Sequence, residues 1–184
     1  MYSMALGEIR KRLDEIDASI ADSLGKRSTY SVNSGAYIAT VYGVNPDVTK
    51  FYMESRKKLC KPGEDSSTYK ETALIDGELI ALIDRRIKHG EDVVKAKLET
   101  NPYLLNVTDK RLENGLRDTK REDEVIKRAI GIASGYGIDN DIIADYFRWI
   151  MNETTRLEIN YVNQNRSRLS LDVKRKLRKL GINL

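Results

Sequence analysis

The feature that most constrains the fold is a regular apolar stripe near the amino terminus. Its members are spaced three and four residues apart: Leu6, Ile9, Leu13, Ile16, Ile20 and Leu24. This spacing places them on one face of an α-helix, and charged residues fill the other face. The stripe therefore predicts an amphipathic helix that must bury one side against other elements.

The chain after this helix is weakly patterned up to a clear break. Residues 28–44 mix serine, glycine, threonine, valine and tyrosine, which suits a strand or irregular structure. Asn45-Pro46-Asp47 then predicts a short helix, with Asp47 as its expected cap. Lys61-Pro62-Gly63 is the strongest linker signal. We therefore predict a first unit over residues 1–62.

The second unit, residues 63–163, is predicted to be helical. One long helix is expected from about Ser66 to Leu98, with Ser67 or Thr68 as its cap. Residues 99–116 contain Asn-Pro and Asn-Gly steps, which predict a loop or a short broken helix.

Two further helices are expected at about 118–134 and from Asp139 onward. Residues 164–184 form a strongly basic helical tail, which we expect to pack through its apolar side. That side holds Leu171, Val173, Leu177 and Leu180.

Part of the first stripe is repeated later in the chain. Ile16-Asp17, Ile20, Leu24 and Arg27 recur at the same spacing as Ile75-Asp76, Leu79, Ile83 and Arg86. Amphipathic helices often match by chance, but a repeated Ile-Asp step followed by arginine at the same distance is more specific. The match indicates a faint internal repeat.

Composition excludes several kinds of chemistry. One cysteine, Cys60, and one histidine, His89, allow neither an internal disulfide nor a histidine–cysteine metal cluster. They also argue against a Ser-His-Asp or Cys-His mechanism. Carboxylates alone are able to hold magnesium, but we expect no metal and no cofactor.

Charge and hydropathy suggest the location of the protein and the kind of partner it binds. We see no signal-peptide core and no apolar run of membrane-spanning length, and we expect a soluble, cytoplasmic protein. The net charge of +4 suits an anionic partner. The basic tail suggests nucleic acid only weakly, so we expect neither a nucleic-acid nor a membrane partner.

Polar residues share one helical face at three places in the second unit. Arg86 and Lys97 are separated by about 16 Å along a helix, so both side chains can reach one small dianion. Each set alone is more often a solvated or helix-starting group than a site. The three sets are Arg86, Val93 and Lys97; Asp118, Arg121 and Glu122; and Thr154 with Glu158.

Taken in order, these pieces resemble the all-helical, AroQ-type chorismate mutases. The first stripe, through Arg27, is similar to the opening helix of that family, and residues 75–158 are similar to nearly its whole length. With the segment between them included, the two regions span about four fifths of the chain, from Leu6 to Glu158. The most specific pieces are Asp84-Arg85-Arg86, Val94-Lys95-Ala96-Lys97, Arg117-Asp118-x-x-Arg121-Glu122 and Phe147-x-x-Ile150-Met151-x-x-Thr154.

The resemblance implies an all-α helical bundle and conversion of chorismate to prephenate without a cofactor. It assigns Arg86, Lys97 and Arg121 to the two substrate carboxylates, with Lys97 also reaching the ether oxygen. Glu158 occupies a position that is glutamine in some members and glutamate in others. On this basis Arg86, Lys97 and Glu158 are the expected catalytic residues.

The resemblance also assigns the rest of the pocket. Asp118 and Glu122 match groups that orient the substrate hydroxyl, while Thr154 and Val93 match lining positions. One arginine in the family comes from the partner subunit's first helix. Here Arg10 stands at that position in the first unit, whereas the second unit has Tyr69.

The first unit departs from the family pattern elsewhere. It has Ile38 where a lysine belongs and Lys50-Phe51 where an Arg-Glu pair belongs, and nothing in it matches the third helix. We therefore predict a pseudo-dimer of one incomplete and one complete repeat, with Arg10 completing a single site. A homodimer in which Arg10 reaches another chain is the other arrangement.

Three alternatives stay open at this point. An isochorismate-pyruvate lyase or a 4-amino-4-deoxychorismate mutase would use a similar cationic pocket. A non-catalytic, mutase-like binding or regulatory protein would retain the fold without the activity.

Overall fold

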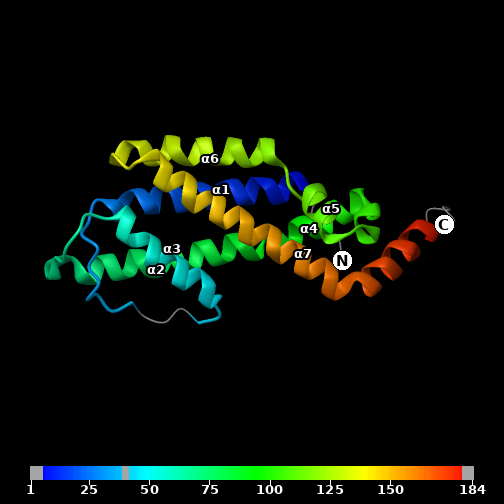
Figure 1. Cartoon of the computed structure of the whole chain (residues 1–184), viewed down its shortest axis with the longest axis horizontal. Coiled ribbons are helices and arrows are strands. Elements are labelled where there is room, and N and C mark those ends of the chain that lie inside the picture. The colour runs from blue at the N-terminus through cyan, green and yellow to red at the C-terminus, as the bar shows by residue number, and fades with distance from the viewer. Residues whose placement is uncertain (1–5, 39–41, 180–184) are drawn as a thin grey trace.

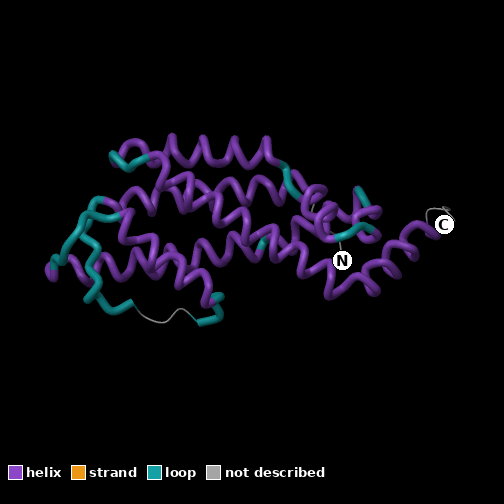
Figure 2. Tube along the Cα trace, in the orientation of Figure 1, coloured by secondary structure: helices purple, strands orange, loops and turns teal. Residues whose placement is uncertain are grey.

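The fold described here is that of a computed structural model, which describes residues 6–38 and 42–179. Over those ranges it contains helices and no strand, so the all-α prediction is confirmed (Figures 1 and 2). The elements are α1 (Leu6–Ser28), α2 (Pro46–Leu59), η1 (Ser66–Thr68), α3 (Tyr69–Lys88), α4 (Gly90–Thr100), η2 (Pro102–Asn106), α5 (Asp109–Leu116), α6 (Thr119–Ala133), η3 (Ser134–Tyr136) and α7 (Asn140–Lys179).

The helices form an elongated bundle around one main core. Helix α1 packs against α3 and α6, and α7 crosses the bundle in contact with α3, α4 and α6 (Figure 1). Ile20 and Leu24 of α1 are fully buried together with Leu79 and Ile83 of α3 and Phe147 of α7. The first apolar stripe therefore buries its face against the second unit, so the two predicted units share a core.

Two predicted helix starts differ from the structure. Asn45, not Asp47, caps α2, because its side-chain oxygen accepts a hydrogen bond from the Asp47 N–H at 2.9 Å and Pro46 takes the first helical position. Asp65 caps the short η1 in the same way, accepting from the Ser67 N–H. Thr68 precedes α3 but makes no side-chain capping bond.

The long helix predicted over residues 66–98 is divided in the structure. Helix α3 ends at Lys88 and α4 starts at Gly90, with His89 between them. A Cβ on Gly90 would lie 3.0 Å from the methyl group of Thr154, so α4 starts in close contact with α7. Helix α4 thus leaves α3 at a point where α7 passes closely.

The segment 99–116 is a broken helix rather than a plain loop. Elements η2 and α5 bury a second apolar cluster against α4 and α7, with Leu104, Leu112 and Leu116 at its centre and Val162 of α7 on the other side. This cluster fixes the end of α5 beside the start of α6.

The basic segment is continuous with α7. The helix runs without interruption through residues 163 and 164 to Lys179, and its last turns extend past α4 and α5 (Figure 1). Leu171 is 57% exposed, so the expectation that it packs is wrong. Leu180 and the side chains of Val173 and Leu177 lie outside what the structure describes. No helix within 6–38 or 42–179 is long and apolar enough to cross a membrane.

Candidate active site

One cavity collects all nine residues singled out from the sequence. It encloses about 570 Å³, including space open to solvent, and lies where α1, α4, α6 and α7 meet the end of α3. The nine are Arg10, Arg86, Val93, Lys97, Asp118, Arg121, Glu122, Thr154 and Glu158. Arg10 therefore shares a cavity with the second unit of its own chain.

Arg10 enters the cavity from the first helix and pairs with the start of α6. Its Nη2 donates to Asp118 Oδ2 at 2.7 Å. The other oxygen of Asp118 accepts from the Arg121 N–H at 3.2 Å, which caps α6. Asp118 thus connects the cap of α6 to α1.

Arg86 lies at the end of α3 and is 7% exposed. Its Nε donates to Asp17 Oδ1 of α1 at 2.7 Å, so its two terminal nitrogens are the ones that can face a ligand. Burial raises the pKa of Asp17, although the charge of Arg86 acts in the opposite direction. The second oxygen of Asp17 is buried without a hydrogen-bond partner among the described residues.

Arg121 is held against α1 by two acceptors. Its Nη2 donates to Asp14 Oδ1 at 2.7 Å and to the Arg10 carbonyl at 3.3 Å. Arg128, about two helical turns further along α6, donates to the same Asp14 oxygen at 2.6 Å. Burial acts to raise the pKa of Asp14, but the two guanidinium groups lower it overall.

Lys97 and Glu158 both line the cavity and lie side by side, with Nζ and Oε2 3.7 Å apart. Lys97 also donates to the Leu116 carbonyl at the end of α5. Glu158 is 3% exposed, and burial raises its pKa to about 7 even though Lys97 and Arg86 act to lower it. A protonated and an ionised form of Glu158 therefore coexist near neutral pH.

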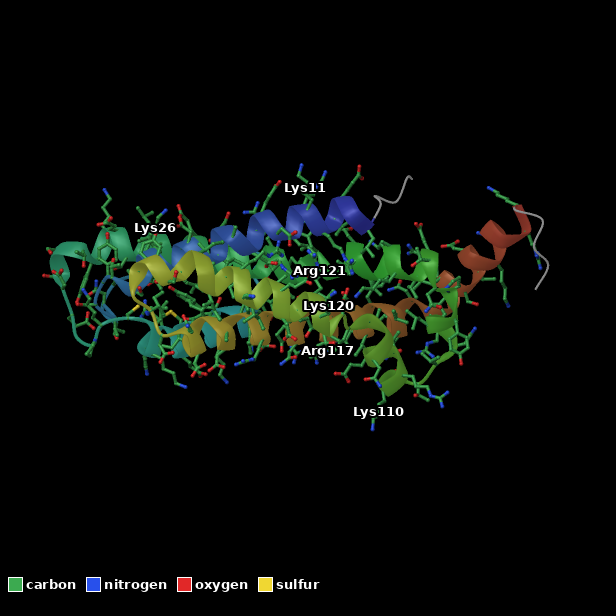
Figure 3. All side chains as sticks on the ribbon, turned by 90° about the horizontal axis from the view of Figure 1, so that it is seen from above. Lys11, Lys26, Lys110, Arg117, Lys120 and Arg121 are labelled. Atoms are coloured by element: carbon green, nitrogen blue, oxygen red, sulfur yellow. The ribbon has the colours of Figure 1, made fainter. Side chains whose placement is uncertain are left out.

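Arg117, which does not line the cavity, donates to both carboxylate oxygens of Glu122 at 3.2 and 3.1 Å. Thr154 donates its hydroxyl hydrogen to the Ile150 carbonyl at 2.8 Å, so its oxygen is left as an acceptor. Figure 3 shows Arg117 and Arg121 in the middle part of the molecule, whereas Lys11 points outward from α1.

Sequence reasoning missed residues of two kinds. Asp14, Asp17 and Arg117 hold the site's charged groups without lining the cavity. Asp14 and Asp17 stand four and seven residues after Arg10, so their spacing indicates that they share a face of α1 with Arg10 but does not indicate their partners on other helices. The remaining lining residues are mostly apolar: Leu13, Leu116, Val125, Met151 and Thr155.

The donor types around the cavity suit an organic anion better than a metal. Across the described part of the chain, no group of three or more histidine, cysteine, aspartate or glutamate side chains is placed to hold a metal ion. The cavity presents four cationic side chains and three carboxyl groups, and each carboxyl already faces a cation.

Over the described residues these features define a helical protein with a cationic cavity, suited to a small molecule that carries more than one carboxylate. The family described as chorismate mutase type II matches residues 68–159, which is half of the chain. The chain belongs to this family.

Individual relatives agree with the family. A chorismate mutase from Schizosaccharomyces pombe is 28% identical, over 65% of this chain and 55% of the relative. The chloroplastic chorismate mutase 1 of Petunia hybrida is 26% identical, over 68% and 46%. The chain thus spans about half the length of these relatives.

A solved structure agrees on the fold. The crystal structure of a chorismate mutase from Candida albicans in complex with L-Trp has a TM-score of 0.73 at 19% identity. The match covers 87% of this chain and 91% of that one.

Proposed function

We propose that this chain is a chorismate mutase, which rearranges chorismate to prephenate in the cavity described above. The observation that carries the proposal is the placement of Lys97 and a protonatable Glu158 side by side, among three arginines. Such a cavity offers donors for two carboxylates and, separately, for one oxygen that gains charge.

The reaction breaks the ether C–O bond and forms a C–C bond in one intramolecular step. It needs no nucleophile, because the electrons move within the substrate. What the protein must supply is a compact, chair-like orientation and stabilisation of the charge that develops on the ether oxygen. The lining side chains divide naturally between these two tasks.

The arginines orient the substrate through its carboxylates. The terminal nitrogens of Arg86 give a bidentate site for one carboxylate, while Arg10 of α1 and Arg121 of α6 bind the other. Asp118 and Glu122, at the start of α6, accept the substrate's ring hydroxyl. Val93, Thr154 and the apolar lining exclude water.

Lys97 and Glu158 act on the ether oxygen. Lys97 donates as a cation, and Glu158 donates when its carboxyl group is protonated. Both groups are positioned before the charge appears, so their contribution grows in the transition state and raises kcat. Removing one such donor typically costs about 3–4 kcal/mol.

The pseudo-dimer is part of the same proposal. Arg27 of the first unit donates to Asp76 at 2.7 Å, and Arg86 of the second donates to Asp17 at 2.7 Å. The two repeats thus exchange equivalent ion pairs, as two subunits do around a two-fold axis. In this arrangement Arg10 acts within its own chain. A cytoplasmic location is also a proposal, since one relative is chloroplastic.

The test is to incubate the purified chain separately with chorismate, isochorismate and 4-amino-4-deoxychorismate and to identify the products. Prephenate from chorismate, with little turnover of the other two, is the expected result. Pyruvate release from isochorismate, or faster turnover of the amino compound, would assign a different enzyme. Binding without turnover of any of the three would assign a non-catalytic protein.

A further inference from the structure

Arg117 is a charged residue next to the cavity that the proposed mechanism does not use. It lies in the one-residue step between α5 and Asp118, the cap of α6, and its own N–H donates to the Glu113 carbonyl at 3.0 Å. Its side chain is 28% exposed and does not line the cavity. A direct contact with substrate is therefore not its role.

The guanidinium group of Arg117 joins three helices. Nε and Nη2 donate to the two oxygens of Glu122 on α6, and Nη2 also donates to Asn152 Oδ1 on α7 at 2.7 Å. On the α5 side, Nη1 lies 3.6 Å from Glu113 Oε1. Contacts with α5 and α7 thus fix the guanidinium group of Arg117 while it binds the Glu122 carboxylate of α6.

The two hydrogen bonds from Arg117 determine the orientation of the Glu122 carboxylate. With both oxygens bound by one planar group, the carboxylate cannot rotate without breaking two hydrogen bonds. A freed Glu122 would be drawn toward the cavity's cations, which the proposed substrate's carboxylates need. One lone pair on each oxygen remains available to a ligand hydroxyl.

We propose that Arg117 is a positioning residue, which holds Glu122 in the orientation that accepts the substrate hydroxyl. This inference rests on the proposed function of the cavity. Lysine at this position would keep the charge but would lose the bidentate geometry. The arrangement also explains why the end of α5 matters to the site, although most of α5 lies outside it.

A double-mutant cycle on the full chain tests the inference, with kcat and KM for chorismate as the readout. Arg117→Ala is expected to lower kcat/KM about tenfold, a typical effect for losing a bidentate charged pair. Arg117→Lys should restore less than half of that loss. In a Glu122→Gln background, Arg117→Ala should change kcat/KM less than about twofold, because its effect passes through Glu122.

Two variants control for trivial effects. Arg148→Ala removes an exposed arginine that pairs with Asp145 on α7 and should leave kcat/KM unchanged. Asn152→Ala removes only the exposed anchor of Arg117, and keeps the test valid if Arg117→Ala unfolds. Its smaller loss should likewise disappear with Glu122→Gln.

The outcomes distinguish failure of the positioning role of Arg117 from failure of the proposed chorismate mutase function. An active wild type in which the Arg117 and Glu122 effects simply add, or in which Arg117→Lys restores full activity, overturns the positioning role alone. A wild type that turns over none of the three substrates refutes the proposed function and this inference with it.

Discussion

Glu158 gives the sharpest test of the proposed chemistry, because burial brings its titration into an accessible range. With a pKa of about 7, its carboxyl group is about nine-tenths protonated at pH 6 and about one-tenth protonated at pH 8. Only the protonated form donates to the ether oxygen. We therefore expect kcat/KM to fall about tenfold from pH 6 to pH 8.

Glu158→Gln isolates this group, since an amide donates at every pH. The variant should show less than about a twofold change across the same range. The assay is loss of chorismate absorbance at saturating and subsaturating substrate in buffers of constant ionic strength. Glu153→Gln is the matched control, because Glu153 lies on the same helix and pairs with Arg156 outside the active-site cavity.

Stability gives an independent check on the same pKa. The folded state binds the Glu158 proton more tightly than the unfolded state, so this contribution is complete below about pH 4.5 and is lost as pH rises through about 7. The loss is roughly 3 kcal/mol. Urea titrations at pH 5 and pH 8 measure this effect. Wild type should lose unfolding free energy relative to Glu158→Gln between pH 5 and pH 8.

Three results would refute this reasoning. A tenfold fall that persists in Glu158→Gln places the titrating group elsewhere, and a flat wild-type profile means that burial does not control Glu158. A pH-independent difference in unfolding free energy would contradict the raised pKa itself.

Three further substitutions test catalysis and packing. Lys97→Ala should lower kcat about 100- to 1,000-fold with an unchanged helical circular dichroism spectrum, and retention of more than a tenth of the activity would contradict its assignment. Gly25→Ala should lower the unfolding free energy by about 1–3 kcal/mol, because its Cβ would lie 2.1 Å from the Tyr136 ring. Gly77→Ala, with nothing within 4 Å, should instead be neutral or stabilising in a denaturant titration.

The sequence predicted what depends on periodicity and on local chemistry. Helix α1 follows from its apolar stripe, and α6 follows from the helical pattern over about 118–134. At the start of α2, Asn45 and Asp47 are both good capping residues, and only the backbone geometry, which the sequence does not give, selects Asn45. The break at His89 is not predicted, although Gly90 follows it; in the structure it falls where α4 starts closely against α7.

The cavity itself illustrates a similar limit. The family resemblance supplied nine residues, and the fold brings all nine together. It did not supply their partners, because Asp14, Asp17 and Arg117 act on residues far away in the sequence or on another helix. Ion pairs of this kind follow from helix packing, which periodicity alone does not specify.

The repeated Ile-Asp and Arg motif has two different consequences in one chain. At the first copy of the arginine, Asp76 accepts from Arg27 and also from Tyr52 and Arg56 of α2, so both of its oxygens are used inside the core. At the second copy, Asp17 accepts only from Arg86 among the described residues, and the rest of that guanidinium lines the cavity.

Helix α2 therefore explains why one copy of the motif is filled and the other is open. We expect Arg27→Lys to lower the unfolding free energy by several kcal/mol while kcat/KM of the folded protein stays within about threefold, because its partners are all internal. Arg86→Lys should instead affect activity more than stability. Its kcat/KM should fall at least about 100-fold, because a bidentate carboxylate site is lost. Urea titration and steady-state kinetics on both variants measure this. Equal losses of activity would show that the two arginines are not specialised in this way.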